Sequence, residues 1–255
     1  GPEDALRFAR GEEVTSTGGL KAKLERPLDF LVAAVLLAVP VGLIMTQPDL
    51  GTALLVATVI GSAIMAQALT QDVGVLLLAN ALVTGAMLFV LITILGALSG
   101  AHFNPLVTLI MAARRDLAWG AVLPYLMAQI VGALAGLVLT HAMFDLSLVQ
   151  VSTHVRGGQG QVLAEAVATF GLIFTIFGGI HARANVPALV GGYITAAYWF
   201  TSSTSFANPI MLLARSMTNT PSGIIPAATP SFLAAEVVGG VLAAVLAGWL
   251  FRKDA

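Results

Sequence analysis

Two Asn-Pro dipeptides, Asn104-Pro105 and Asn208-Pro209, are the residues of this chain best suited to a defined chemical task. Each follows a loop of small or polar residues and opens a short apolar run. Proline fits the first turn of a helix because its missing N–H would have no partner there, and asparagine caps such a helix well. The apolar runs are too short to cross a bilayer, so the repeat predicts two half-helices. The copies read SGAHFNPLVTLIMAARR (99–115) and STSFANPIMLLARSMT (203–218).

The chemistry of two such half-helices follows from where they meet. Two helix N-termini that abut in the middle of a membrane place their partial positive charges at one point. Each Asn amide can also donate a hydrogen bond to a passing oxygen atom. We expect cations and protons to be repelled there, whereas uncharged hydroxylated solutes would pass. Non-helical chain persists at membrane depth only when it is buried or lines water, so the pattern indicates a pore.

The composition is that of an integral membrane protein. Hydrophobic residues make up 58% of the chain and charged residues only 10%, and the mean hydropathy is +0.92. A soluble domain carries about 25% charged residues. The net charge of −1 gives no support for nucleic-acid binding, and the absence of cysteine excludes disulfides and thiolate metal sites. The four histidines lack metal-ligand spacing, so we expect no metal and no cofactor.

Six longer apolar stretches surround the two Asn-Pro units. The first unit lies between the second and third stretches, and the second unit lies between the fifth and sixth. The chain therefore divides into two halves, each with three helices and one half-helix. An odd number of crossings per half inverts the second half, as in transport folds whose broken helices mark the permeation site. The expected helices cover residues 50–69, 74–98, 118–143, 161–181, 186–202 and 230–251.

The distribution of basic residues gives the orientation and the domain boundaries. Short loops around Arg114, Arg183 and Arg252 fall on one side of a six-helix arrangement, which the positive-inside rule makes cytoplasmic. Arg156 and Arg215 fall on the other side. We expect a polar segment at 1–27, an extra hydrophobic helix at 28–47 that is either spanning or interfacial, and a channel domain at 48–253.

The two Asn-Pro units resemble those of the aquaporin superfamily of major intrinsic proteins. The similarity covers about residues 50–251, with Leu106 and Ile210 where alanine is usual. Glu165 and Thr169 match the Glu-x-x-x-Thr signature of this family, whereas the first half has Pro48 at the Glu position. The resemblance implies an all-α, right-handed bundle of six transmembrane helices plus two half-helices. It also implies a homotetramer with one pore per subunit in a bacterial inner membrane.

The resemblance also assigns roles to residues around the pore. Counted from the two asparagines, Thr84, Ala196, Ser205 and Met211 take the positions of the selectivity filter. Arg215 follows Asn208 by seven residues, about two helical turns, and is expected in the outer vestibule. The filter would be wide and uncharged, which implies water, glycerol-like polyols, undissociated arsenous acid or methylated arsenicals as solutes.

Three further expectations concern the supports of the pore, the width of its midpoint and the branch of the family that the chain resembles most. Glu165 and His102 are expected to hold the Asn-Pro loops. The larger side chains of Leu106 and Ile210 predict a tighter and more apolar midpoint than alanine would give. The segments AAYWFTSSTSFANP and LLARSMTNT are most similar to a bacterial branch associated with arsenic-resistance genes.

Two alternatives remain open at this point. A proton-coupled secondary carrier would use Glu165, Asp49 or Asp145 to bind protons, since intramembrane carboxylates are costly and often functional. Separately, residues from about 20 to 55 resemble a fragment of the rod-shape SEDS family of cell-wall glycosyltransferases. This short resemblance gives no reason to assign a glycosyltransferase activity. The loops contain no cluster of acid, base and metal ligands, so we do not expect the protein to be an enzyme.

Overall fold

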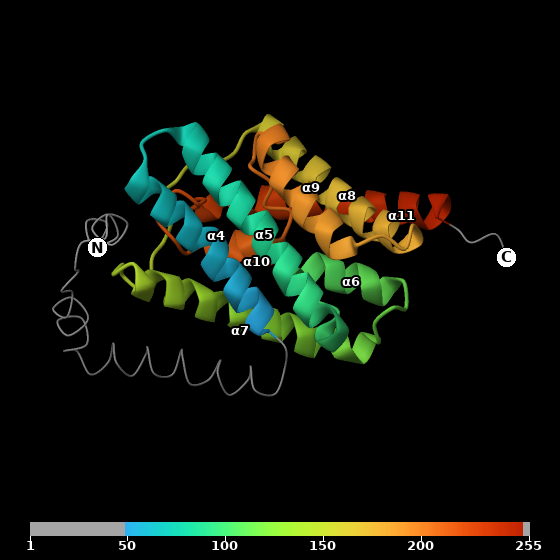
Figure 1. Ribbon diagram of the computed structural model, residues 1–255. Coiled ribbons are helices and arrows are strands. Elements are labelled where there is room, and N and C mark those ends of the chain that lie inside the picture. Colours follow the sequence, from blue (N-terminus) through green and yellow to red (C-terminus); the bar gives the residue numbers. More distant parts are fainter. Residues whose placement is uncertain (1–48, 252–255) are drawn as a thin grey trace.

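The computed structural model of the chain describes residues 49–251, and these residues form a bundle of helices without strands (Figure 1). The expected polar segment at 1–27 and the expected helix at 28–47 lie outside the described residues, as do both ends of the expected channel domain 48–253. The helices are α4 (Leu50–Leu69), α5 (Val73–Ser99), α6 (Pro105–Ala113), α7 (Trp119–Met143), α8 (Gln159–His181), α9 (Val186–Phe200), α10 (Pro209–Ser216), the 3-10 helix η1 (Pro226–Ala228) and α11 (Thr229–Leu250).

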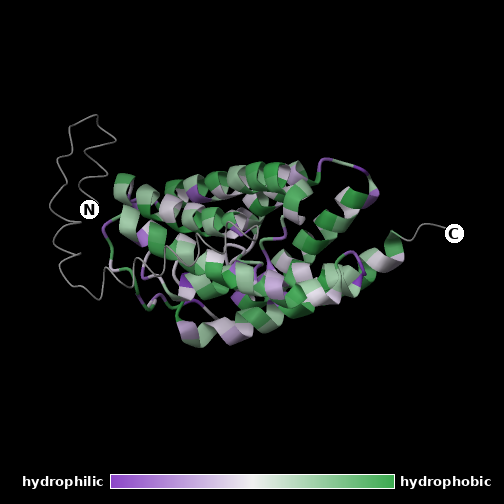
Figure 2. Ribbon diagram, turned by 90° about the horizontal axis from the view of Figure 1, so that it is seen from below, coloured by the Kyte–Doolittle hydropathy of each residue, from purple (hydrophilic) through white to green (hydrophobic). Residues whose placement is uncertain are grey.

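The lengths and surfaces of these helices suit a bilayer. Within the described part, α4, α5, α7, α8 and the η1–α11 unit are each long and apolar enough to span a membrane. Helix α9 has 15 residues, about 22 Å, and ends two residues before its expected boundary. Large apolar side chains such as Leu98, Val245 and Trp249 are exposed on the outside of the bundle, and hydrophilic residues gather at the turns and in the interior (Figure 2). The chain is therefore an all-α, multi-pass membrane protein, as predicted.

The two halves of the chain repeat the same helix contacts. Helix α4 packs along α7, and α8 packs along α11. A glycine allows close approach at each crossing: Gly136 of α7 lies against the backbone of Ala53, and Gly239 of α11 lies against the backbone of Ala166. A side chain at either glycine would collide with the facing carbonyl, so these helices pack through small residues, as membrane helices commonly do.

The short helices α6 and α10 lie among the long ones, in the interior of the bundle (Figure 1). The α6–α7 connection, the α8–α9 turn and the end of α11 lie at one end of the molecule, on the right in Figure 1. This is the end that carries Arg114 and Arg183 and that the charge distribution assigns to the cytoplasm. At the opposite end, the loops 144–158 and 217–225 bind one another, with Ile225 N–H donating to His154 O at 2.7 Å.

Candidate functional site

Asn104 and Asn208 bind each other's loops at the point where the two half-helices begin. Each caps its own helix, because its Oδ1 accepts the main-chain N–H two residues on, at 2.9 Å for Asn104 and 3.0 Å for Asn208. The Nδ2 of Asn104 donates to Ala207 O at 2.8 Å, and the Nδ2 of Asn208 donates to Phe103 O at 2.8 Å. The predicted half-helices α6 and α10 therefore meet N-terminus to N-terminus.

The backbone leading into each asparagine has the same unusual conformation. The first and third residues before Asn104 have φ of 47° (Phe103) and 48° (Ala101), and those before Asn208 have φ of 47° (Ala207) and 49° (Ser205). Left-handed geometry at a non-glycine residue costs about 1–2 kcal/mol, so both loops are held by their surroundings. Two of these left-handed residues, Phe103 and Ala207, also supply the carbonyls that accept the amide hydrogens of Asn208 and Asn104.

One cavity runs past both Asn-Pro loops. Among the predicted site residues, seven line it: Thr84, His102, Asn104, Ser205, Asn208, Met211 and Arg215. Pro105, Leu106, Ala196, Pro209, Ile210 and Glu165 are not part of the lining. The polar part of the wall comes from loop residues 100–104 and 205–208, and an apolar part comes from α5, α8 and α9, with Leu88, Ile92, Leu172, Ile176, Val190 and Ile194.

The predicted filter position on α9 requires a correction. Ala196 is exposed on the outer face of α9, whereas Ile194 and Tyr198 line the cavity. Tyr198 is 3% exposed, and its hydroxyl lies 3.4 Å from Thr84 Oγ1. A displacement of two residues along a helix turns the side chain by about 200°. The count back from Asn208 crossed a loop of unknown geometry and therefore selected the wrong face.

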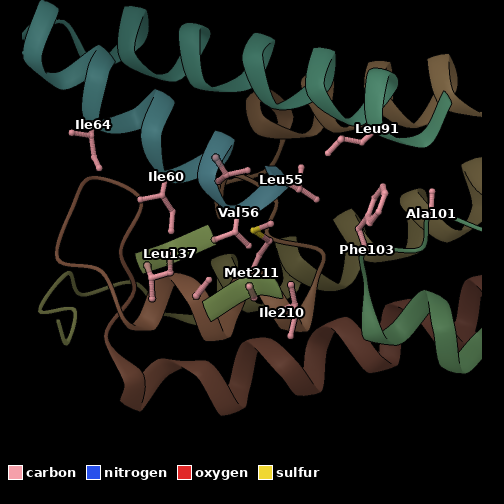
Figure 3. Close-up of a cluster of buried hydrophobic side chains, with 13 residues drawn as sticks. Leu55, Val56, Ile60, Ile64, Leu91, Ala101, Phe103, Leu137, Ile210 and Met211 are labelled. Atoms are coloured by element: carbon pink, nitrogen blue, oxygen red, sulfur yellow. The ribbon is translucent and has the colours of Figure 1, made fainter. Parts of the chain in front are cut away.

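The expectation of a narrowed midpoint is also wrong, because neither enlarged side chain of the Asn-Pro units lines the cavity. Leu106 packs into an apolar cluster with Ile173 and contacts Gly240 of α11, where an added methyl group would come within 2.6 Å of Leu106 Cδ2. Ile210 belongs to a second cluster, with Leu55 and Val56 of α4 (Figure 3). Both side chains point into the helix packing.

Arg215 gives the outer part of the cavity a positive charge that the predicted filter lacked. It lies in the last turn of α10, is only 3% exposed, and lines the cavity. Its guanidinium lies 3.6 Å from the centroid of the Phe206 ring, a cation–π geometry. Its Nε donates to Ser222 O. The guanidinium is thus enclosed between the Phe206 ring and the 217–225 loop and is not exposed in an open vestibule.

Two carboxylates on neighbouring helices hold the second loop. Glu165 of α8 accepts the N–H groups of Phe206 at 2.9 Å and Ala207 at 2.8 Å, one on each oxygen. Glu236 of α11 accepts the N–H of Asn208 at 3.0 Å. Both side chains are fully buried. Sequence reasoning assigned the supporting role to Glu165 and left Glu236 open between a similar role and an interfacial position near the start of its helix.

The first loop is held by neutral groups instead. His102 N–H donates to the Tyr125 hydroxyl at 3.3 Å, and its ring stacks on Tyr125 with centroids 4.9 Å apart. His102 Nδ1 lies 3.1 Å from Thr108 Oγ1, which also accepts from Gln129 Nε2 at 3.0 Å. Asp49, which follows Pro48 at the expected glutamate position, caps the start of α4 and makes no hydrogen bond to the first loop within the described residues.

Residues 47–251 match the family model described as Major intrinsic protein. The chain belongs to this family. Major intrinsic proteins are membrane channels, and the chain is accordingly a passive channel for small uncharged solutes. Residues 1–50 match a second model, described as Protein of unknown function (DUF3604); the fragmentary resemblance of residues 20–55 to the SEDS family stays a prediction.

Similar proteins include several major intrinsic proteins from bacteria. Aquaglyceroporin AqpS of Rhizobium meliloti is 56% identical over 209 residues, which is 80% of this chain and 88% of that protein. Aquaporin Z of Bradyrhizobium diazoefficiens is 29% identical over 76% of this chain and 87% of its own length. A glycerol uptake facilitator of Streptococcus pneumoniae is 31% identical over 36% of this chain and 45% of its own length.

Proposed function

We propose that this channel conducts water and small polyols such as glycerol across a bacterial inner membrane, as a homotetramer with one pore per subunit. The observation that carries the proposal is the pair of asparagine amides set beside one continuous cavity. The names of its relatives, an aquaglyceroporin and a glycerol uptake facilitator, support the same solute class.

The asparagine amides supply donors for a solute at the centre of the cavity. Each amide has two N–H bonds, and one is committed to the carbonyl of the opposite loop. Both asparagines line the cavity, so their second N–H can reach a solute oxygen. Since the N-termini of α6 and α10 converge there, a cation would meet two positive helix ends.

The two kinds of wall suit a polyol. A glycerol molecule has a row of hydroxyl groups on one side and carbon-bound hydrogens on the other. Its hydroxyls would bind the loop residues 100–104 and 205–208, while its carbons pass along the apolar residues of α5, α8 and α9. Sites that bind small molecules commonly combine an apolar wall with a few placed polar groups.

We expect the cavity to be narrowest at its outer end, where Thr84, Tyr198, Ser205 and Arg215 line it, and we call this part the outer constriction. It would select solutes that accept hydrogen bonds. Ser205 lines the cavity, and its buried Oγ has no protein partner in the described part of the chain. Undissociated arsenous acid and its methylated derivatives are also small, uncharged and hydroxylated. We include them among the proposed solutes on that chemistry.

A proton-coupled carrier is less well supported by the contacts of the carboxylates. Both oxygens of Glu165 accept backbone N–H groups of the second Asn-Pro loop. Protonation would break one of these bonds and disturb the loop, which suits a fixed support better than a shuttle. Asp49 caps α4 and is not part of the cavity lining.

Solute flux into proteoliposomes separates the two functions. Under a glycerol gradient, we expect swelling that rises linearly with the gradient and does not respond to an imposed pH difference. Empty liposomes measure the background. Saturable uptake that follows the pH gradient would favour the carrier, and swelling no faster than the background would contradict the channel.

A further inference from the structure

A second arginine lies beside the outer constriction, on the loop between α7 and α8. The guanidinium carbon of Arg156 is 5.7 Å from the centroid of the Phe206 ring, the same ring that Arg215 contacts at 3.6 Å. The two guanidinium groups are therefore no more than about 9 Å apart, which is within the screening length of about 10 Å at 0.1 M salt. An ion at this point of the pore experiences both charges.

The outer loop fixes both arginines through three consecutive carbonyl groups. Arg156 donates to Pro221 O at 3.0 Å and to Gly223 O at 2.9 Å, while Arg215 donates to the carbonyl between them, that of Ser222. Arg156 also donates to Ser203 O at 3.5 Å. The two side chains thus share one segment of chain and keep a fixed separation.

Neither charge is neutralised by a salt bridge. Within residues 49–251, the one ion pair joins Arg114 to Asp116 at the cytoplasmic end. The acceptors of Arg156 are neutral carbonyls and the Thr204 hydroxyl. The charge of Glu165 acts on both arginines, but both of its oxygens bind backbone N–H groups of the loop and neither forms an ion pair with an arginine. The outer constriction therefore has two positive charges with no carboxylate bound to either.

We propose that Arg156 is a specificity-determining residue of this channel, supplying through its charge a second barrier to cations at the outer constriction. Arg156 is not part of the cavity lining, so we expect no direct contact between Arg156 and the solute. Its effect is electrostatic, whereas Arg215 both repels cations and offers N–H groups to the solute. This inference rests on the proposed channel function, since it concerns which solutes that pore rejects.

The substitutions Arg156→Gln and Arg156→Lys separate the charge from the hydrogen bonds. Glutamine retains donors for the loop carbonyls and removes the charge, whereas lysine retains the charge with fewer donors. Arg183→Gln removes one positive charge from the opposite end and serves as the matched control. Each variant would be reconstituted into liposomes, and glycerol-driven swelling and methylammonium uptake would be measured in parallel.

We expect Arg156→Gln to raise methylammonium uptake by about 2- to 30-fold, the range for one unit charge at about 8 Å between water-like and protein-like screening. Glycerol swelling should stay within about twofold of wild type, and Arg156→Lys should exclude methylammonium as wild type does. Equal leaks in the glutamine and lysine variants would overturn the proposal, because Arg156 would then act only as a clamp for the loop.

A methylammonium leak in Arg156→Gln no greater than that in Arg183→Gln would overturn it as well. The wild-type protein tests the channel itself separately. If wild-type liposomes swell in glycerol no faster than empty ones, the proposed function fails; if they swell faster and Arg156→Gln shows no added leak, only this inference fails.

Discussion

Asn104 and Asn208 each donate an amide hydrogen to the carbonyl of the residue that precedes the other. These bonds join residues that are 103 and 105 positions apart in sequence, and they close the meeting point of α6 and α10. The left-handed residues Phe103 and Ala207 supply the accepting carbonyls, so each half of the chain helps to fix the pore element of the other half. This relationship accounts for the chain's having two Asn-Pro units, since each requires the other.

Replacement of Asn208 by aspartate tests this reciprocity. Asn208→Asp keeps an oxygen that can accept the N–H of Ile210 but removes the donor to Phe103 O. A negative charge would also appear between two helix N-termini. We expect glycerol swelling to fall at least about tenfold, since a buried carbonyl left without its partner costs about 1–3 kcal/mol. Asn104→Asp should behave in the same way; normal swelling in both variants would show that the amides are dispensable.

The two carboxylates that hold the second loop should differ in their tolerance of glutamine. Glu165 uses both oxygens as acceptors, so Glu165→Gln places an amide N–H against a backbone N–H. Glu236 uses one oxygen for the loop, so Glu236→Gln can keep its bond. We expect Glu165→Gln to lose about 1–3 kcal/mol of stability and Glu236→Gln clearly less. Thermal unfolding in detergent measures both, and the reverse order would contradict the assigned bonds.

A glycine on α11 makes room for the enlarged residue of the first Asn-Pro unit. Gly240→Ala would bring a methyl group to within 2.6 Å of Leu106 Cδ2 and should destabilise the protein by about 1–3 kcal/mol. Leu106→Ala together with Gly240→Ala should recover part of that loss. Unfolding midpoints of the wild-type protein, the two single variants and the double variant form a complete double-mutant cycle. Strict additivity would mean that Leu106 and Gly240 do not pack together.

Met211 offers a test of the width of the outer constriction. It lines the cavity three residues after Asn208, on the same half-helix as Arg215. Met211→Arg adds a longer, charged side chain there and should reduce glycerol uptake more than water uptake, because the larger solute is excluded first. Met211→Leu is the control that keeps the apolar character. Equal loss of water and glycerol flux would place Met211 outside the constriction.

Local chemical signals made part of this site predictable. Proline at the first helical position and asparagine before it located α6 and α10, and long apolar runs located the other helices to within about two residues at most ends. Helix α9 shows where this reasoning failed. It ends at Phe200 and not at the expected residue 202, so counting back from Asn208 through the intervening loop selected Ala196, which lies on the wrong face. Each residue of error turns the face by about 100°.

The remaining features depend on contacts that no local pattern encodes. The carbonyls and the hydroxyl that accept from Arg156 lie between 47 and 67 residues away in sequence, and the backbone N–H that donates to Glu236 lies 28 residues away. The left-handed residues Ala101 and Phe103 are not glycines, so their identities gave no sign of the conformation. Only the assembled fold brings these groups to the loops.

The most direct test of the central claim uses the absence of cysteine from the chain. Ser205→Cys introduces a single thiol at a buried position that lines the cavity, and Ala196→Cys introduces one on the outer face of α9. Methyl methanethiosulfonate would be added to proteoliposomes of each variant, with labelling checked by mass spectrometry and glycerol swelling recorded before and after. We expect labelled Ser205→Cys to lose glycerol swelling while Ala196→Cys and the wild-type protein keep it. Complete labelling of Ser205→Cys with unchanged swelling would contradict the claim that solutes pass between the two Asn-Pro loops.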